Sequence, residues 1–151
     1  MVQQRAYTII ELLITFLLIG ILASIAIFAL SNSRAKSRDA KRVSDIQVIR
    51  ASLEQHWLTL ASYPASAPLI NLGAGNAAVL TSNGFEALPG TGTFFLAMPL
   101  GAKSGEYYQY QSTVSYGYAI RFATETTTSY GAPGTYYAHS GGVVDKDSAS
   151  K

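Results

Sequence analysis

The sequence predicts an α+β fold in which one long N-terminal helix packs on a small antiparallel β-sheet. Three features of the chain support this prediction. Leu12 to Leu30 is an uncharged run of 19 residues. Residues 31–62 contain no Gly or Pro, and their apolar side chains recur every three or four positions, as on one face of a helix. From Tyr63 onward the composition shifts to Gly, Ser, Thr, Ala and Tyr, with short aromatic and β-branched runs between turn residues.

The overall composition limits the classes of protein to which the chain can belong. Its 151 residues are enough for one compact domain, and the net charge of +2 gives no argument for a specific nucleic-acid partner. Only 13% of the residues are charged, against about 25% in soluble domains. The absence of cysteine excludes a disulfide framework, a thiolate metal site and a cysteine nucleophile. The sequence contains no phosphate-binding loop and no catalytic serine motif, so we expect neither enzymatic activity nor a cofactor.

The uncharged run is long enough to form a membrane-spanning helix. At about 1.5 Å per residue it covers roughly the 30 Å hydrocarbon core of a bilayer. It is apolar on every side, unlike the striped helix of a soluble protein. Gly20, Ala23 and Ser24 recur in it at helical spacing, and such small residues let a second helix approach closely in lipid. An ordinary membrane anchor and a secretory signal cleaved after Ala26 both fit these features.

A third interpretation rests on the residues that lead into this run. Residues 5–13 read RAYTIIELL. This segment resembles the processing site of the type IV pilin and type II secretion pseudopilin family, and the similarity continues through residues 19–26. The resemblance implies a pilin-like fold, cleavage by a prepilin peptidase between Ala6 and Tyr7, and methylation of the new amine on Tyr7. The chain departs from the family pattern at Ala6, where Gly is usual, at Tyr7, where Phe is usual, and at Phe28, where many members have Pro.

Glu11 has two compatible interpretations. Thr8 and Glu11 fit the capping-box pattern T-x-x-E at the start of a helix. However, a carboxylate that leads an uncharged run costs a few kcal/mol in lipid and often marks a functional site. In the family that the segment resembles, this glutamate pairs with the N-terminal amine of a neighbouring subunit. By this resemblance Thr8, Glu11 and Gly20 are assembly residues, and Tyr7 supplies the amine.

The amphipathic segment extends the helix to about Leu60. Pro64 and the residue before it end the run. We therefore predict one helix from Thr8 to Leu60, with residues 1–6 as a leader, residues 7–30 as a transmembrane and polymerisation half, and residues 31–62 as an amphipathic half. The apolar face of that second half is formed by Val43, Ile46, Ile49, Leu53, Trp57 and Leu60.

A cluster of basic residues follows the uncharged run. It consists of Arg34, Lys36, Arg38, Lys41 and Arg42, and only Asp39 interrupts it. The simplest interpretation is a solvated helix face beside a membrane; lipid phosphates or acidic groups on adjacent subunits are the alternatives. The positive-inside rule places such a cluster in the cytoplasm, whereas the pilin-like interpretation places it outside.

Residues 63–151 are expected to form the globular loop and sheet region. Three segments read as strands, namely 107–111, 116–123 and 135–139. Thr93 to Ala97 is predicted as a short helical turn, residues 64–92 as a loop-rich stretch, and residues 145–151 as a frayed end. Nine of the ten tyrosines lie at or after Tyr63, where strand packing explains them more simply than carbohydrate binding or surface adhesion does.

The acidic residues of this region offer little for metal binding. Asp145 and Asp147 are a close pair that calcium would accept, but calcium usually takes more oxygen ligands than this tail supplies. We therefore predict no metal as the main interpretation.

The preferred function is that of a structural subunit of a type IV pilus or related filament. The alternatives are the major pseudopilin of a type II secretion system and, from a different class, a secreted or membrane-anchored binding or adhesin domain. By the resemblance, its partners are further copies of itself, prepilin peptidase, a membrane assembly platform with its ATPase, and the lipid bilayer before assembly. The expected location is the cytoplasmic membrane, with the C-terminal domain outside, and then an extracellular or periplasmic filament.

Overall fold

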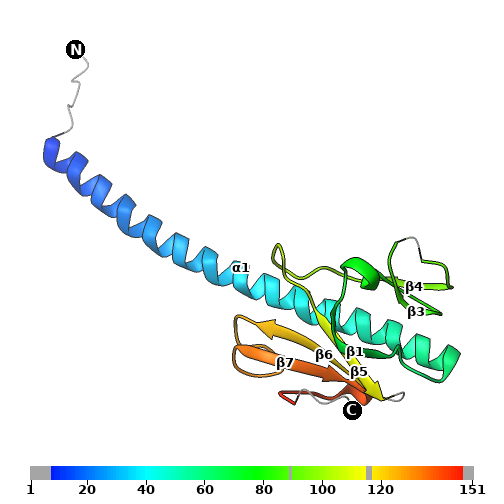
Figure 1. Cartoon of the computed structure of the whole chain (residues 1–151). Coiled ribbons are helices and arrows are strands. Elements are labelled where there is room, and N and C mark those ends of the chain that lie inside the picture. The colour runs from blue at the N-terminus through cyan, green and yellow to red at the C-terminus, as the bar shows by residue number, and fades with distance from the viewer. Residues whose placement is uncertain (1–7, 89, 115–116, 148–151) are drawn as a thin grey trace. The chain divides into compact units, whose positions relative to one another are not determined.

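A computed structural model of the chain describes residues 8–88, 90–114 and 117–147. It contains one helix, α1 (Ile9–Leu60), of 52 residues, followed by strands and two short 3-10 helices within the described part. The chain divides into two compact units, Met1–Ala35 and Lys36–Lys151. The predicted α+β architecture with one long N-terminal helix is confirmed (Figure 1).

The first unit is helical from Ile9 onward, and the hydroxyl groups of its apolar half are satisfied within the helix. The hydroxyl of Thr15 donates to the carbonyl of Glu11 at 2.7 Å, and that of Ser24 donates to the carbonyl of Gly20 at 2.8 Å. Such hydroxyls leave no unpaired donor in an apolar environment. The helix can therefore carry these residues into lipid at little cost.

The strands of the second unit form two antiparallel sheets. The larger sheet has the order β1-β5-β6-β7-β8 and the smaller has the order β3-β2-β4. The strands of the larger sheet are β1 (Ser66–Asn71), β5 (Gln109–Val114), β6 (Gly117–Thr124), β7 (Gly134–His139) and β8 (Val144–Asp145). Those of the smaller sheet are β2 (Val79–Thr81), β3 (Gly84–Glu86) and β4 (Phe94–Ala97), and the 3-10 helices are η1 (Gly75–Ala77) and η2 (Ser140–Gly142).

The three predicted strands correspond to β5, β6 and β7, but other parts of the sheet prediction are wrong. The segment Thr93 to Ala97 is not a helical turn, because Phe94–Ala97 pairs with β2 and places Leu96 opposite Leu80. Residues 64–92, predicted as loop-rich, also contain the short elements β1, η1, β2 and β3. Asp145 is not frayed, because it lies opposite Tyr137 in the ladder between β7 and β8. These strands are short, and β1 pairs with a strand far along the chain, which a local pattern does not reveal.

The core lies between the second half of α1 and the sheets. Ile46, Ile49 and Leu53 are fully buried on one helix face, as the three- and four-residue spacing predicts. Buried tyrosines cover them, including Tyr108 and Tyr118, and the phenol groups find acceptors inside the chain. The hydroxyl of Tyr108, for example, donates to Asp45 Oδ2 at 2.7 Å. Packing therefore explains most of the tyrosine content, as the sequence indicated.

Truncating a core residue on α1 should show that the sheets depend on this helix face. Ile49→Ala removes a fully buried side chain, so we expect a loss of about 2–5 kcal/mol in unfolding free energy. The matched control is the neighbouring Val48→Ala, at a position that is 46% exposed, which should cost no more than about 0.5 kcal/mol. Urea unfolding of the detergent-solubilised chain, followed by Trp57 fluorescence, measures both. Equal costs for the two variants would contradict this core assignment.

Candidate functional site

The start of α1 places a carboxylate at the head of an apolar surface. The backbone N–H of Glu11 donates to the Thr8 hydroxyl at 3.3 Å, which forms one half of the predicted capping box. Both residues are exposed, and Glu11 lies in the first helical turn, where its negative charge interacts favourably with the positive end of the helix dipole. Ala6 and Tyr7, the residues predicted to flank the cleavage point, lie outside the described residues, so their predicted roles remain predictions.

The apolar residues that follow Glu11 have no cover within the chain. Every large hydrophobic residue from Ile9 to Leu30 is at least half exposed, with Ile9 at 83% and Leu30 at 50%. By length and composition α1 is apolar enough to cross a membrane, and its most apolar window is unburied. A continuous apolar surface of this kind requires lipid or other helices around it.

No contact within its own chain requires a glycine at position 20. A Cβ built at this position meets no heavy atom within 4 Å, and a glycine inside a helix costs roughly 0.5–1 kcal/mol relative to alanine. A small residue is explained if another helix packs closely against it. The assembly role of Gly20 stays a prediction.

The basic cluster is only partly a solvated face. Arg34 and Lys36 are exposed, but Arg42 is buried, with its side chain 3% exposed. Its guanidinium binds Asp39 at 2.7 Å through Nη1, and Glu106 at 2.8 Å through both Nε and Nη2. The prediction of a solvated face is therefore wrong for Arg42, because three carboxylates of its own chain, the third being Glu125, neutralise it in the interior.

Arg38 and Lys41 also find partners within the chain. Arg38 makes a paired hydrogen bond to Glu125, at 2.9 Å through Nε and 2.6 Å through Nη2. Lys41 Nζ donates to Asp45 at 2.7 Å and to the carbonyl of Leu100 at 2.7 Å. No local pattern indicates the pair of Arg38 with Glu125, which lie 87 positions apart, whereas Lys41 and Asp45 stand at the i,i+4 spacing of a helical ion pair. The one sequence signal for a long-range partner was an acidic loop residue, Glu125, with no basic residue next to it in the sequence.

Asp39 is the second buried charge of this cluster, and it organises the loop after β6. Its carboxylate accepts the backbone N–H groups of Glu125 and Thr126, at 3.0 and 2.7 Å, and the Thr126 hydroxyl at 2.7 Å. Burial alone would raise the pKa of Asp39, but these donors and Arg42 outweigh it, so the pKa is lowered. Asp39 therefore remains ionised and holds the loop against α1.

The acidic partners of the cluster are held ionised in the same way. The hydrogen bonds from Arg38 are the largest cause that lowers the pKa of Glu125 well below its usual value. Arg42 likewise lowers the pKa of Glu106. We call Arg38, Asp39, Arg42, Glu106 and Glu125 the ion cluster. It joins α1 to the loop before β5 and the loop after β6, and it is a structural clamp rather than a reactive site.

The predicted acidic pair near the C-terminus is engaged within the chain. Asp145 Oδ1 accepts the backbone N–H of Asp147 at 2.8 Å and lies 3.0 Å from Nε2 of the buried His139. Among the described residues, no group of three or more His, Cys, Asp or Glu side chains is placed to hold a metal ion.

Comparison with known proteins identifies the N-terminal segment. Residues 1–27 match the family described as the prokaryotic N-terminal methylation motif. The chain is 30% identical over 64 residues to the type II secretion system core protein G of Dickeya chrysanthemi, covering 42% of each protein. It is 31% identical over 64 residues to that of Escherichia coli, covering 42% of this chain and 44% of the relative. The protein from Klebsiella michiganensis is 32% identical over 64 residues, covering 42% and 45%.

The matched region spans less than half the length of these curated relatives. No solved structure matches the chain significantly. The resemblance predicted from residues 5–13 is thereby confirmed for the N-terminal motif.

The ion cluster predicts that the folded state loses stability in acid. The pKa of Asp39, Glu106 and Glu125 is lower in the folded chain than the ordinary values of 3.8 and 4.5. Because the unfolded chain then binds more protons, the stabilisation is present above about pH 4.5 and is lost as the pH falls below it. Urea unfolding of the detergent-solubilised chain over this range measures the loss. An unfolding free energy that stays constant down to about pH 3 would contradict it.

Glu86 provides a matched variant for the acid titration. Hydrogen bonds from Thr81, Thr91 and the Gly92 N–H lower its pKa to about 2. Glu86→Gln removes one proton-binding group whose folded and unfolded pKa differ, so the stability of this variant should depend less steeply on pH below about 4.5. Lys36→Gln, an exposed position outside these networks, should leave the slope unchanged.

Proposed function

We propose that the chain is a structural, non-catalytic subunit of a helical filament that polymerises through the exposed apolar half of α1. The observation that carries the proposal is a methylation-type N-terminal motif over residues 1–27, continuing into a helix whose large apolar residues from Ile9 to Leu30 are all at least half exposed. Before assembly this half lies in the cytoplasmic membrane, with the second unit outside. In the filament, neighbouring helices replace the lipid.

Glu11 supplies the specific contact in this proposal. Processing between Ala6 and Tyr7 by a prepilin peptidase gives Tyr7 a new amine, which is then methylated and lies four positions before Glu11 in the sequence. A buried carboxylate in an apolar filament core is costly unless a cation pairs with it. The amine of one subunit pairs with Glu11 of its neighbour, and both charges are neutralised. The exposed position of the Glu11 side chain in the single chain leaves it free for such a contact.

The relatives favour one machinery over the other. Three of the similar proteins are each named type II secretion system core protein G, which supports the major pseudopilin of a secretion system over a type IV pilus subunit. The partners are then further copies of this chain, a membrane assembly platform and its ATPase, and the filament is periplasmic. A conventionally secreted binding domain accounts less well for the methylation motif.

Removing the carboxylate should separate membrane insertion from assembly. Glu11→Ala leaves the apolar run intact, so membrane extraction should show normal insertion. Filaments should be lost, because the neighbour's amine would be buried without a counter-ion. Pull-down of sheared filaments and electron microscopy measure assembly, and Asp147→Ala, at an exposed acidic residue of the second unit, is the control. Filament yield equal to that of the wild type would overturn the role of Glu11.

The mature N-terminus distinguishes the filament route from conventional secretion. Mass spectrometry of the purified chain should find an N-methylated Tyr7, and deletion of the prepilin peptidase should leave Arg5 and Ala6 attached. Ala6→Gly, which restores the residue usual in the family, should increase the processed fraction or leave it unchanged. A chain that begins at Ile27 would instead indicate signal peptidase and would exclude the proposed assembly, since the polymerisation segment would be gone.

A further inference from the structure

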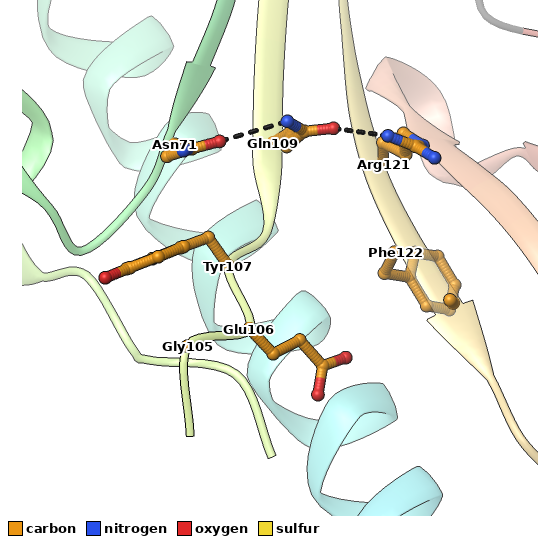
Figure 2. A pocket seen from close by; sticks show the side chains of 8 residues that line it. Asn71, Gly105, Glu106, Tyr107, Gln109, Arg121 and Phe122 are labelled. Carbon is orange, nitrogen blue, oxygen red and sulfur yellow. Dashed lines mark hydrogen bonds between the residues drawn. The ribbon is translucent and has the colours of Figure 1, made fainter. Parts of the chain in front are cut away.

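The larger sheet carries a row of polar side chains on the face opposite the core. Asn71, Gln109 and Arg121 lie side by side on β1, β5 and β6, because Asn71 pairs with Gln109 and Gln109 pairs with Arg121 in register. Arg121 is exposed between the core residues Ile120 and Phe122, so the row faces away from α1. Gln109 Nε2 donates to Asn71 Oδ1 at 3.0 Å, and Arg121 Nη1 donates to Gln109 Oε1 at 2.6 Å (Figure 2).

These two hydrogen bonds fix which way the amides point. A guanidinium only donates, so the oxygen of Gln109 must face Arg121 and its NH₂ must face Asn71. The oxygen of Asn71 is then used by Gln109, and the NH₂ of Asn71 points out of the row. The row therefore offers mainly donors to a ligand: the Asn71 amide, one Gln109 hydrogen and the rest of the Arg121 guanidinium.

A pocket opens beside this row, between β5 and β6. The β5–β6 pairing extends no further in this direction than Gln109 and Arg121, whereas β6 continues to Thr124 in its pairing with β7. The resulting pocket has a volume of about 310 Å³, and the side chain of Tyr107, which is 39% exposed, stands at one side of it (Figure 2). This volume is at the lower end of the range for small-molecule sites.

Arg121 supplies the positive charge of the pocket. No carboxylate among the described residues lies within ion-pair distance of Arg121. Glu106 also lines the pocket, but both of its oxygens accept hydrogen bonds from the buried Arg42, at 2.8 Å each. Both Glu106 oxygens are therefore occupied by Arg42, and an anion beside Arg121 meets the donors of the polar row.

We propose that this pocket binds a sugar ring that carries a carboxylate, of the uronic acid class. Arg121 binds the carboxylate, for which the planar guanidinium is well suited. The Asn71 and Gln109 amides donate to ring hydroxyls, and the apolar face of the sugar packs on Tyr107. An acidic side chain of another protein offers the same carboxylate, but it lacks the hydroxyls and the ring face that the amides and Tyr107 accommodate. The proposal is independent of filament assembly.

Binding of monosaccharides to the full-length chain in detergent micelles tests the proposal. The probes are glucuronate, glucose, which has a hydroxymethyl group in place of the carboxylate, and acetate, which has the carboxylate alone. In an NMR titration, the side-chain amide signals of Asn71 and Gln109 should shift as glucuronate is added. The dissociation constant obtained from these shifts should be at least tenfold lower for glucuronate than for glucose or acetate. No shift with glucuronate, or equal affinity for glucose, would overturn the proposal. Equal affinity for acetate would also overturn it and would favour an acidic side chain of another protein.

Matched variants locate the interaction. Arg121→Gln should weaken glucuronate binding roughly tenfold or more and remove the preference over glucose. Tyr107→Leu should weaken the binding of both sugars alike. Lys36→Gln, which removes an exposed cation elsewhere, should change neither. Because Arg121 is exposed, its variant is expected to fold, and circular dichroism checks this. Unchanged glucuronate affinity in a folded Arg121→Gln chain would exclude this site.

Discussion

The buried contact between Arg42 and the carboxylates around it is the constraint on which the rest of the folded unit depends. Arg42 binds Asp39 on its own helix, Glu106 before β5 and Glu125 after β6. Leaving one of these charges buried without its partner would cost about 3–5 kcal/mol, a large part of the stability of a domain of this size. The cluster therefore fixes where both loops meet α1, and with them the ends of β5 and β6. The core tyrosines pack inside the frame that these contacts define.

The ion cluster also bears on the orientation of the chain. The positive-inside rule reads five basic residues after the apolar run as a cytoplasmic signal. In the structure Arg38, Lys41 and Arg42 form ion pairs within the second unit, whereas Arg34 and Lys36 are exposed and form no ion pair among the described residues. The rule applies to short loops, and folded domains are translocated largely regardless of their charge. Because the basic residues lead directly into such a domain, their number is weak evidence against an external location.

How much the sequence could predict depends on how local each signal is. The helix was predictable almost to the residue, since its periodicity and its lack of Pro are properties of neighbouring positions, and the structure places it at Ile9–Leu60. The Thr8 cap was readable for the same reason. The burial of Arg42 could not be predicted in this way, because its partner Glu106 is 64 positions away. The polar row that ends at Arg121 depends on a distant pairing as well, that of Asn71 with Gln109.

The two halves of α1 meet different demands, and the difference points to what drives assembly. The second half buries its apolar face in its own chain, whereas the first half buries none. Lipid tails are as apolar as leucine, so moving the residues between Leu12 and Leu30 from lipid into a helical filament gains little hydrophobic free energy. In the proposed filament, close packing at Gly20 and the neutralisation of Glu11 would differ more between the two environments. Under that proposal the carboxylate at the head of the helix, more than the apolar surface, would determine whether the subunit remains in the membrane or joins the filament.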